Sequence, residues 1–103
     1  MIACIIEYGV RPGMKDKLRE AFAALVPEIQ RIDGFISMDN FQSQTRPGAM
    51  LEISYWRDEC ALQSWIDNAA HRELMLLGRN EIFSWYKISS TEIKRQIDWT
   101  REA

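Results

Sequence analysis

The sequence has few of the residues on which disulfide-stapled and metal-binding proteins depend. It contains 2 cysteines and 1 histidine among 103 residues, and neither type recurs at metal-site spacing. We therefore expect no metal. Two cysteines are too few for a disulfide framework, so free thiols are expected, although a bond between Cys4 and Cys60 remains possible. No apolar run is longer than the six residues of 1–6 and of 21–26, far fewer than the roughly 20 residues that span a bilayer.

The charge pattern argues against nucleic-acid and membrane partners. The net charge is −2, with both signs spread along the chain, whereas nucleic-acid binding is typical of a basic patch or stripe. No basic segment precedes the first strand, so the sequence shows no signal peptide and a cytoplasmic location is expected. Apolar residues make up 47% of the chain, which is typical of a globular protein. We expect one domain over residues 1–103.

Hydrophobic periodicity predicts alternating strands and helices. The first strand, 2–10, is apolar on both faces, which indicates that both faces are covered. The next segment, 14–32, has apolar residues at helical spacing, but Pro27 predicts a kink or a short second helix there. Asp58 is a candidate N-cap of a further helix, and Gly78 a candidate stop for a helical stretch over about 68–77. The other predicted strands are 35–43, 50–56 and part of 82–97.

This order predicts an α+β, ferredoxin-like β-α-β-β-α-β domain. Such a domain has a four-stranded antiparallel sheet with its helices on one face. The opposite face, which would carry Ile5 or Ile6, is then bare and apolar. A second copy of the chain is the simplest cover for it, so a homodimer is expected.

Several segments in this order resemble the antibiotic biosynthesis monooxygenase (ABM) domain family. They are Ile32-Asp33-Gly34-Phe35, Phe41-Gln42-Ser43, Pro47-Gly48, Trp56-Arg57-Asp58-Glu59, Trp65, His71-Arg72-Glu73, Gly78-Arg79 and Phe83 to Tyr86. The resemblance covers about residues 1–97. It implies a ferredoxin-like domain whose sheet joins that of a second copy in a dimeric α/β-barrel. The family includes quinol and polyketide monooxygenases and heme-degrading enzymes, so the shared fold does not fix the activity.

The function implied by the resemblance is cofactor-free monooxygenation of a small phenolic or quinol-type aromatic substrate by dioxygen. The substrate anion reduces dioxygen itself, so no cofactor is expected. The protein must supply an apolar cavity, a base near the phenol oxygen and shielding from water. Two alternatives stay open: a heme-binding or heme-degrading monooxygenase, and a dimeric barrel that binds a small ligand without turnover.

The candidate catalytic residues are His71 and Trp65. His71 is the only histidine, and its ordinary pKa of about 6.5 suits a base near neutral pH; alternatively it is a helix-start residue bonded to backbone or solvent. Trp65 lies on an apolar helix stripe, so a core role competes with a catalytic one. The candidate substrate-binding residues are Tyr8, Asn40, Ser54, Tyr55, Arg79 and Tyr86. The alternative roles are packing for the strand tyrosines and exposure to solvent for Arg79.

Heme degradation is the less favoured activity, and this can be tested. The heme-degrading branch of the family combines an asparagine, a tryptophan and a histidine, of which only the tryptophan is matched, by Trp65. Glu7 and Tyr8 stand where the asparagine is expected, and the histidine position falls near Met75. The polyketide monooxygenase pattern also departs, because Ala61 replaces an asparagine. We expect the purified protein with heme and a reductant to release no iron; stoichiometric binding followed by loss of the Soret band would contradict this.

Overall fold

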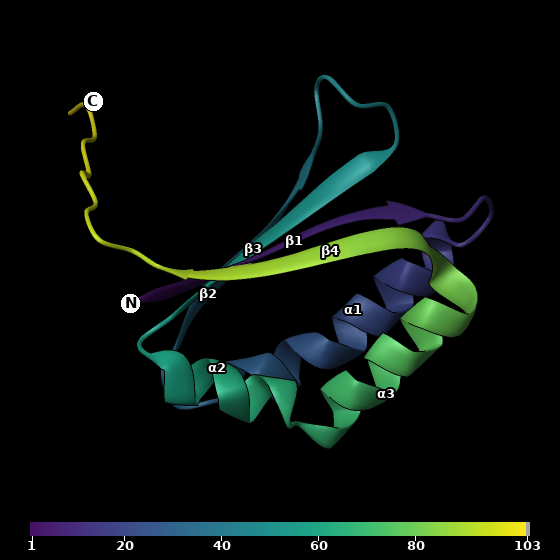
Figure 1. Ribbon diagram of the computed structural model, residues 1–103, viewed down its shortest axis with the longest axis horizontal. Coiled ribbons are helices and arrows are strands. Elements are labelled where there is room, and N and C mark those ends of the chain that lie inside the picture. Colours follow the sequence, from purple (N-terminus) through teal and green to yellow (C-terminus); the bar gives the residue numbers. More distant parts are fainter. Residues whose placement is uncertain (103) are drawn as a thin grey trace.

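The computed structural model describes residues 1–102, which form a four-stranded sheet with a layer of helices on one face (Figure 1). The strands are β1 (Ile2–Val10), β2 (Phe35–Gln42), β3 (Ala49–Trp56) and β4 (Phe83–Glu92). The helices are α1 (Lys15–Gln30), α2 (Glu59–Ile66) and α3 (Ala69–Leu77), and a π-helical turn, η1 (Gly78–Ile82), continues α3. The second helical region of the predicted order is therefore two helices.

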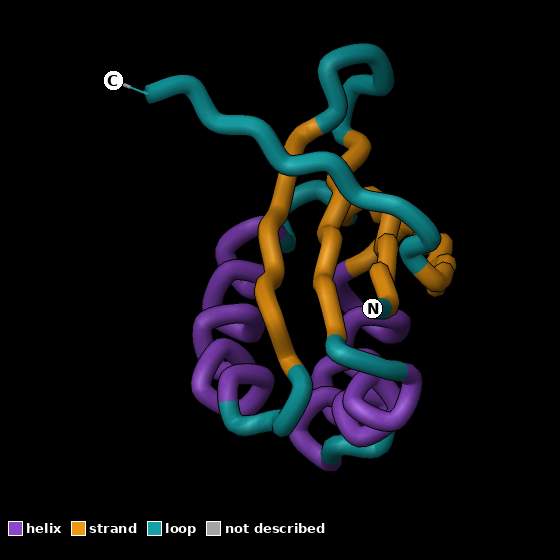
Figure 2. Tube along the Cα trace, turned by 90° about the vertical axis from the view of Figure 1, so that its left-hand side faces the viewer, coloured by secondary structure: helices purple, strands orange, loops and turns teal. Residues whose placement is uncertain are grey.

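The strands are arranged in the order β2-β3-β1-β4, and every neighbouring pair is antiparallel. In the middle of the sheet, Ile6 of β1 lies opposite Glu52 of β3 and Ile88 of β4. The loop that joins β2 and β3 points away from the helices (Figures 1 and 2). This architecture confirms the predicted α+β, ferredoxin-like fold.

Strand alternation divides the side chains of the sheet between a helix-covered face and an open face. The even positions of β1, from Ile2 to Tyr8, lie on the helix-covered face, together with Met50, Glu52, Ser54 and Trp56 of β3. The open face carries Ala3, Ile5, Leu51, Ile53 and Tyr55 from the central strands, and Phe41 and Trp85 from the edges. Of the two candidates, Ile5 is thus the open-face residue.

Two buried clusters fix the helices to the sheet. One surrounds Trp56, which is fully buried and packs edge-on against Phe35 at 5.3 Å and stacks on Trp65 at 6.5 Å between ring centroids. The other surrounds Tyr8 and Ile82 at the opposite end of β1. Tyr8 is 2% exposed and Ile82 is fully buried, so both ends of the helix layer are held by close packing.

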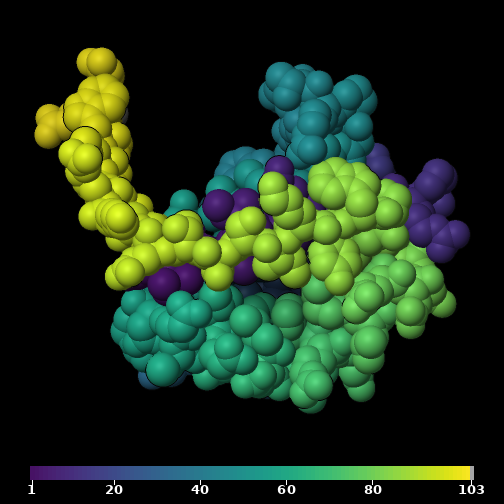
Figure 3. Space-filling view, viewed as in Figure 1, coloured from purple at the N-terminus to yellow at the C-terminus, as the bar shows by residue number. Residues whose placement is uncertain are grey.

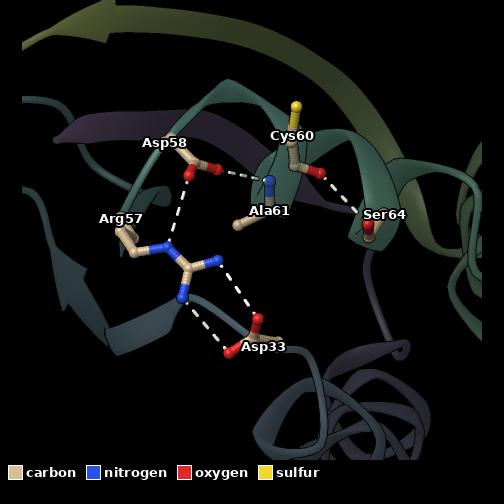
Figure 4. A network of polar contacts seen from close by, with 6 residues as sticks. All are labelled: Asp33, Arg57, Asp58, Cys60, Ala61 and Ser64. Atoms are coloured by element: carbon tan, nitrogen blue, oxygen red, sulfur yellow. Dashed lines mark hydrogen bonds and ion pairs between the residues drawn. The ribbon is translucent and has the colours of Figure 1, made fainter.

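The start of α2 is set by the polar network of Figure 4. The Asp58 carboxylate accepts a hydrogen bond from the Ala61 backbone N–H at 2.9 Å, which confirms the predicted N-cap. Arg57 donates to Asp33 through both terminal nitrogens at 3.2 Å and to Asp58 through Nε at 3.3 Å. The two hydrogen-bonded carboxylates have pKa values below their ordinary range because of these contacts. The network ties α2 to the turn before β2 and fixes the direction of the helix that carries Trp65.

Of the two outcomes predicted for Pro27, a short second helix is wrong, because α1 continues to Gln30. Pro27 is in the last turn, where only one intrahelical hydrogen bond is lost, on an exposed side. The helical stretch predicted to stop at Gly78 does end there, since α3 ends at Leu77 with Gly78 as its C-cap. The φ of Gly78, −58°, is helical, however, and the π-helical turn η1 follows. The glycine also serves packing, because a Cβ there would overlap the ring of Phe83.

The last strand is shorter than the segment in which it was expected. It ends at Glu92, and residues 93–102 have no regular secondary structure and run away from the sheet (Figure 1). Ile97 and Trp99 on this segment are 88% and 72% exposed. Over the described residues, no helix has the length and apolar character needed to cross a membrane. The cytoplasmic location stays a prediction.

We expect the open face to be the contact between two copies of the chain. Ile53 lies at its centre, opposite Ile5 of β1 and Asp39 of β2, so Ile53→Lys would place a charge in the middle of the contact. Light scattering at micromolar concentration should give a dimer mass for the natural chain and for the control Ala24→Lys, on the exposed side of α1. Ile53→Lys should give a monomer. A monomeric natural chain would contradict the prediction.

Candidate active site

A cavity of about 470 Å³ lies between the helices α2 and α3 and the edge strand β4. Figure 3 shows the recess between the β4 strand and the helices below it. The cavity reaches from this opening to the central strands β1 and β3. Its walls are mostly apolar, with a few polar groups at defined places, which is the usual character of a small-molecule site. Its lining residues are Cys4, Ile6, Ile29, Glu52, Ser54, Leu62, Trp65, Ile66, His71, Arg72, Met75, Leu76, Arg79, Tyr86, Ile88 and Ser90.

The sheet wall of the cavity carries one carboxyl group, that of Glu52. Its neighbours on the same face are Ser54 on β3 and Cys4 and Ile6 on β1. The Ser54 hydroxyl accepts a hydrogen bond from Trp56 Nε1 at 2.9 Å, so this hydroxyl is oriented by the core. The structure gives Glu52 no ion pair or hydrogen-bond partner among residues 1–102.

Burial raises the pKa of Glu52 to about 7, because the apolar surroundings disfavour its charged form. Burial, and secondarily the negative charge of Glu52, raises the pKa of the Cys4 thiol and brings that of Tyr8 to about 12. Both groups are therefore protonated near neutral pH, and each remains a hydrogen-bond donor. Glu52, in contrast, changes between acid and carboxylate in the physiological range.

The helix wall includes the rings of Trp65 and His71, which contact each other in a tilted arrangement. Their centroids are 4.5 Å apart with 38° between the ring planes. Asn68 separates the two helices and caps α3, accepting a hydrogen bond from the His71 backbone N–H at 3.0 Å. Because α2 ends at Ile66 and α3 begins at Ala69, His71 does not lie one and a half turns past Trp65 on a continuous helix. The break between the helices instead places His71 in the cavity.

His71 is neutral at neutral pH. Burial lowers its pKa, and a backbone interaction with Ile66 only partly offsets this. Its Nδ1 is buried and has no hydrogen-bond partner among the residues that the structure describes. A neutral imidazole can accept a proton through one ring nitrogen and donate through the other.

A small inner recess extends the cavity toward Tyr8. The recess shares Glu52, Trp65 and His71 with the main cavity and adds Tyr8, Phe22 and Phe83. The Tyr8 hydroxyl donates to Asn40 Oδ1 at 3.4 Å. Asn40 itself lines a separate surface groove beside α1, so it acts on the cavity only through Tyr8.

Two guanidinium groups flank the opening of the cavity. Arg72 of α3 and Arg79 of η1 are exposed, and neither forms an ion pair or side-chain hydrogen bond within the described chain. The π-helical turn that positions Arg79 contains Ile82, whose burial holds the turn in place. Such turns are frequent at functional sites.

Most of the candidate residues named from the sequence meet in this cavity. Trp65, His71, Ser54, Arg79 and Tyr86 line it, and Tyr8 lines the inner recess. Two candidates lie elsewhere. Asn40 faces the neighbouring groove, and Tyr55 lies on the open face of the sheet, opposite Ala3.

Sequence analysis missed Glu52. The available signal was strand alternation, since Glu52 shares a face with Ser54, which was selected. The odd positions of β3 are more apolar, however, and therefore resemble the core-facing side. Only the position of the helices shows that the even positions, including the carboxylate, point inward.

Comparison with known proteins places this geometry in a family. The model of the antibiotic biosynthesis monooxygenase family matches residues 1–75. The chain belongs to the antibiotic biosynthesis monooxygenase family. It is 34% identical over 104 residues to the jasmonate monooxygenase ABM of Pyricularia oryzae, covering 92% of this chain and 48% of that protein. The chain thus spans about half the length of this curated relative.

Solved structures agree on the fold. A candidate ABM monooxygenase from Deinococcus radiodurans superimposes with a TM-score of 0.83 at 14% identity, covering 98% of this chain and 100% of that one. A variant of SnoaB, a cofactor-independent oxygenase from Streptomyces nogalater, gives 0.78 at 11% identity, covering 93% and 95%. Identities this low support the fold alone.

No group of three or more His, Cys, Asp or Glu side chains is placed to hold a metal ion in residues 1–102. The two cysteines are free thiols in different environments: Cys4 is buried and Cys60 is exposed. The carboxyl group of the cavity is that of Glu52, its imidazole is that of His71, and its hydroxyl donors include Tyr86 and Ser90.

The buried carboxyl group predicts a stability that depends on pH. In the folded chain the pKa of Glu52 is about 7, above its ordinary value of 4.5. The contribution of Glu52 to the free energy of unfolding is therefore most favourable below pH 4.5 and is lost as pH rises through 7. Glu52→Gln, which is always neutral, should therefore be more stable than the natural chain at pH 8, by on the order of 1–3 kcal/mol, and similar at pH 4. Thermal unfolding at fixed protein concentration measures this. Glu73→Gln, on the exposed side of α3, should show no such difference; equal shifts at both pH values would contradict the prediction.

Proposed function

We propose that this chain is a cofactor-free monooxygenase that oxidises a small phenolic or quinol-type aromatic compound with dioxygen. The observation that carries the proposal is the cavity: its walls are mostly apolar and include two groups that can accept a proton, Glu52, whose pKa is about 7, and His71, whose pKa lies below its ordinary value. A substrate anion formed there can reduce dioxygen directly, and the mostly apolar walls beside Trp65 suit a flat aromatic ring.

Family membership supports oxygenase chemistry, since the matched family model carries that description and a fold neighbour is called a cofactor-independent oxygenase. The role we propose for His71 is proton transfer from the helix wall. Its ring is neutral and held against Trp65 at 4.5 Å, so its position is fixed before the substrate enters. Trp65 is proposed to form the flat surface on which the substrate ring lies. Arg79, Tyr86 and Ser54 are proposed substrate contacts.

A second candidate substrate class follows from the opening of the cavity. The curated relative is named a jasmonate monooxygenase, and Arg72 and Arg79 offer two guanidinium groups without ion-pair partners in residues 1–102. Guanidinium groups bind carboxylates well. A small apolar carboxylic acid such as jasmonate therefore belongs in the same assay panel as the hydroquinones.

The activity is tested by oxygen uptake with a panel of hydroquinones, naphthols and jasmonate, in the absence of any added cofactor. We expect uptake with at least one hydroxyarene, matched by formation of the corresponding oxygenated product. Saturable binding of panel compounds with no uptake would overturn the proposal and favour a ligand-binding role for the cavity.

His71 is tested by His71→Phe, which keeps an aromatic ring against Trp65 and removes both proton-transferring nitrogens. Turnover should fall by about 10²- to 10⁴-fold, the usual contribution of an acid–base group. The melting temperature should change little or rise, because the buried Nδ1 has no partner to lose. The control is Asn80, an exposed residue of η1, whose replacement by alanine should leave both quantities unchanged. Unchanged turnover in His71→Phe would remove His71 from the mechanism.

A further inference from the structure

The cavity contains one charged group that is unexplained by packing. Glu52 lies on a central strand, opposite Ile6 on one side and Asn40 on the other, and its partly buried side chain lies on the helix-covered face and lines the cavity. A carboxylate in such a place costs free energy unless it is paired, yet residues 1–102 supply it with no ion pair or side-chain hydrogen bond. Groups of this kind cluster at functional sites.

We propose that Glu52 is the catalytic base that takes the proton from the substrate hydroxyl. His71 on the opposite wall then accepts the proton from the ring carbon to which dioxygen has added. The inference rests on the proposed function and adds a residue and a division of roles to it. It is carried by geometry: Glu52 and His71 line both the main cavity and its inner recess, one from the sheet and one from the helix layer. A ring placed between the two walls, beside Trp65, meets both groups.

The assignment gives a balanced reaction for a hydroxyarene with a conjugated ring C–H. The substrate O–H breaks, its proton passes to the Glu52 carboxylate and its electron pair stays on the aryl oxygen. The anion gives one electron to dioxygen, and the two radicals join through a new C–O bond as a peroxide anion, which takes the proton back from Glu52. His71 then accepts the C–H proton as the O–O bond breaks, leaving a carbonyl and hydroxide. Hydroxide takes that proton from His71 and leaves as water, so one substrate and one dioxygen give one quinone-type product and one water.

The surroundings of Glu52 favour this role over that of a permanently charged or neutral group. Its pKa of about 7 makes it a stronger base than an ordinary carboxylate and still leaves it ionised at slightly alkaline pH. No cationic side chain of the described residues forms an ion pair with Glu52. The helices α1 and α2 contribute apolar side chains around it, among them Ile29 and Trp65. The titratable or charged groups that face the same cavity are Cys4 and Tyr8 on β1, Tyr86 on β4, His71 and Arg72 on α3 and Arg79 on η1.

The first test uses turnover. Glu52→Gln keeps the size of the side chain and cannot accept the proton, so kcat/KM should fall by about 10²- to 10⁴-fold. The natural chain should show an acidic limb in its kcat/KM profile near pH 7. That limb should disappear in Glu52→Gln, persist in His71→Phe and reappear with reduced rate in Glu52→Asp. Glu73→Gln should behave as the natural chain. Retention of the limb in Glu52→Gln would overturn the assignment.

The second test does not need turnover, so it separates failure of this assignment from failure of the proposed function. The probe is phenol itself, and its affinity is measured by titration calorimetry at pH 6 and pH 8. An ionised Glu52 accepts a hydrogen bond from the phenol O–H more strongly than the neutral acid does, so affinity should rise by several-fold between these pH values in the natural chain and in Glu73→Gln. In Glu52→Gln it should not change. Affinity independent of pH in the natural chain, or equal pH dependence in Glu52→Gln, would overturn the role of Glu52 even if oxygen uptake is found.

Discussion

The cavity depends on how the helix layer is attached to the sheet. The helix layer packs closely against the sheet at its two ends and less closely between them. At one end Trp56 packs against Phe35 and Trp65, and at the other Tyr8 packs against Phe22 and Phe83. Ile6 lies between the two clusters and contacts both. Since packed cores are stiff, the two clusters hold the helices at a fixed distance from the middle of the sheet, where the space about Glu52 remains open.

The same arrangement explains why the polar groups of the cavity are tolerated. Ser54 is oriented by Trp56 Nε1, and Tyr8 is connected to Asn40, so these hydroxyl groups do not lose hydrogen bonds on burial. Glu52 and His71 are the exceptions, and their pKa values move in the directions that make each neutral form more favourable. Both therefore hold or release protons easily. We regard this as the physical basis for acid–base chemistry in a site that, over the described residues, has no metal-binding cluster.

The polar network at the start of α2 extends this control outward. Asp58 caps the helix, and Arg57 links Asp58 to Asp33 before β2. The network is exposed, so each contact contributes little to the free energy of unfolding. The network matters because it fixes the direction of α2, which carries Trp65. The break at Asn68 then turns α3 so that His71 contacts Trp65.

The sequence by itself determined the order of the elements and the fold class. Period-2 and helical patterns are local, and the N-cap Asp58 and the turn glycine Gly34, with φ of +94°, are local signals as well. It also selected His71, Trp65 and Ser54, which are near one another in the cavity. Pro27 does not divide its helix, because it lies in the last turn, and Gly78 ends α3 but leads into η1, where it makes room for Phe83.

The faces of the sheet were decided only by the tertiary structure. Both sides of β1 are largely apolar, so alternation cannot say which side the helices cover, and β3 is more apolar on the side that they leave open. This ambiguity placed Tyr55 among the candidates and left out Glu52. The physical reason is that the helix-covered face can retain a carboxylate because a cavity lies over it, while the apolar open face is the one that we expect to meet a second copy of the chain. The sequence gives the type of each side chain, but the pKa of that side chain depends on the residues that surround it after folding.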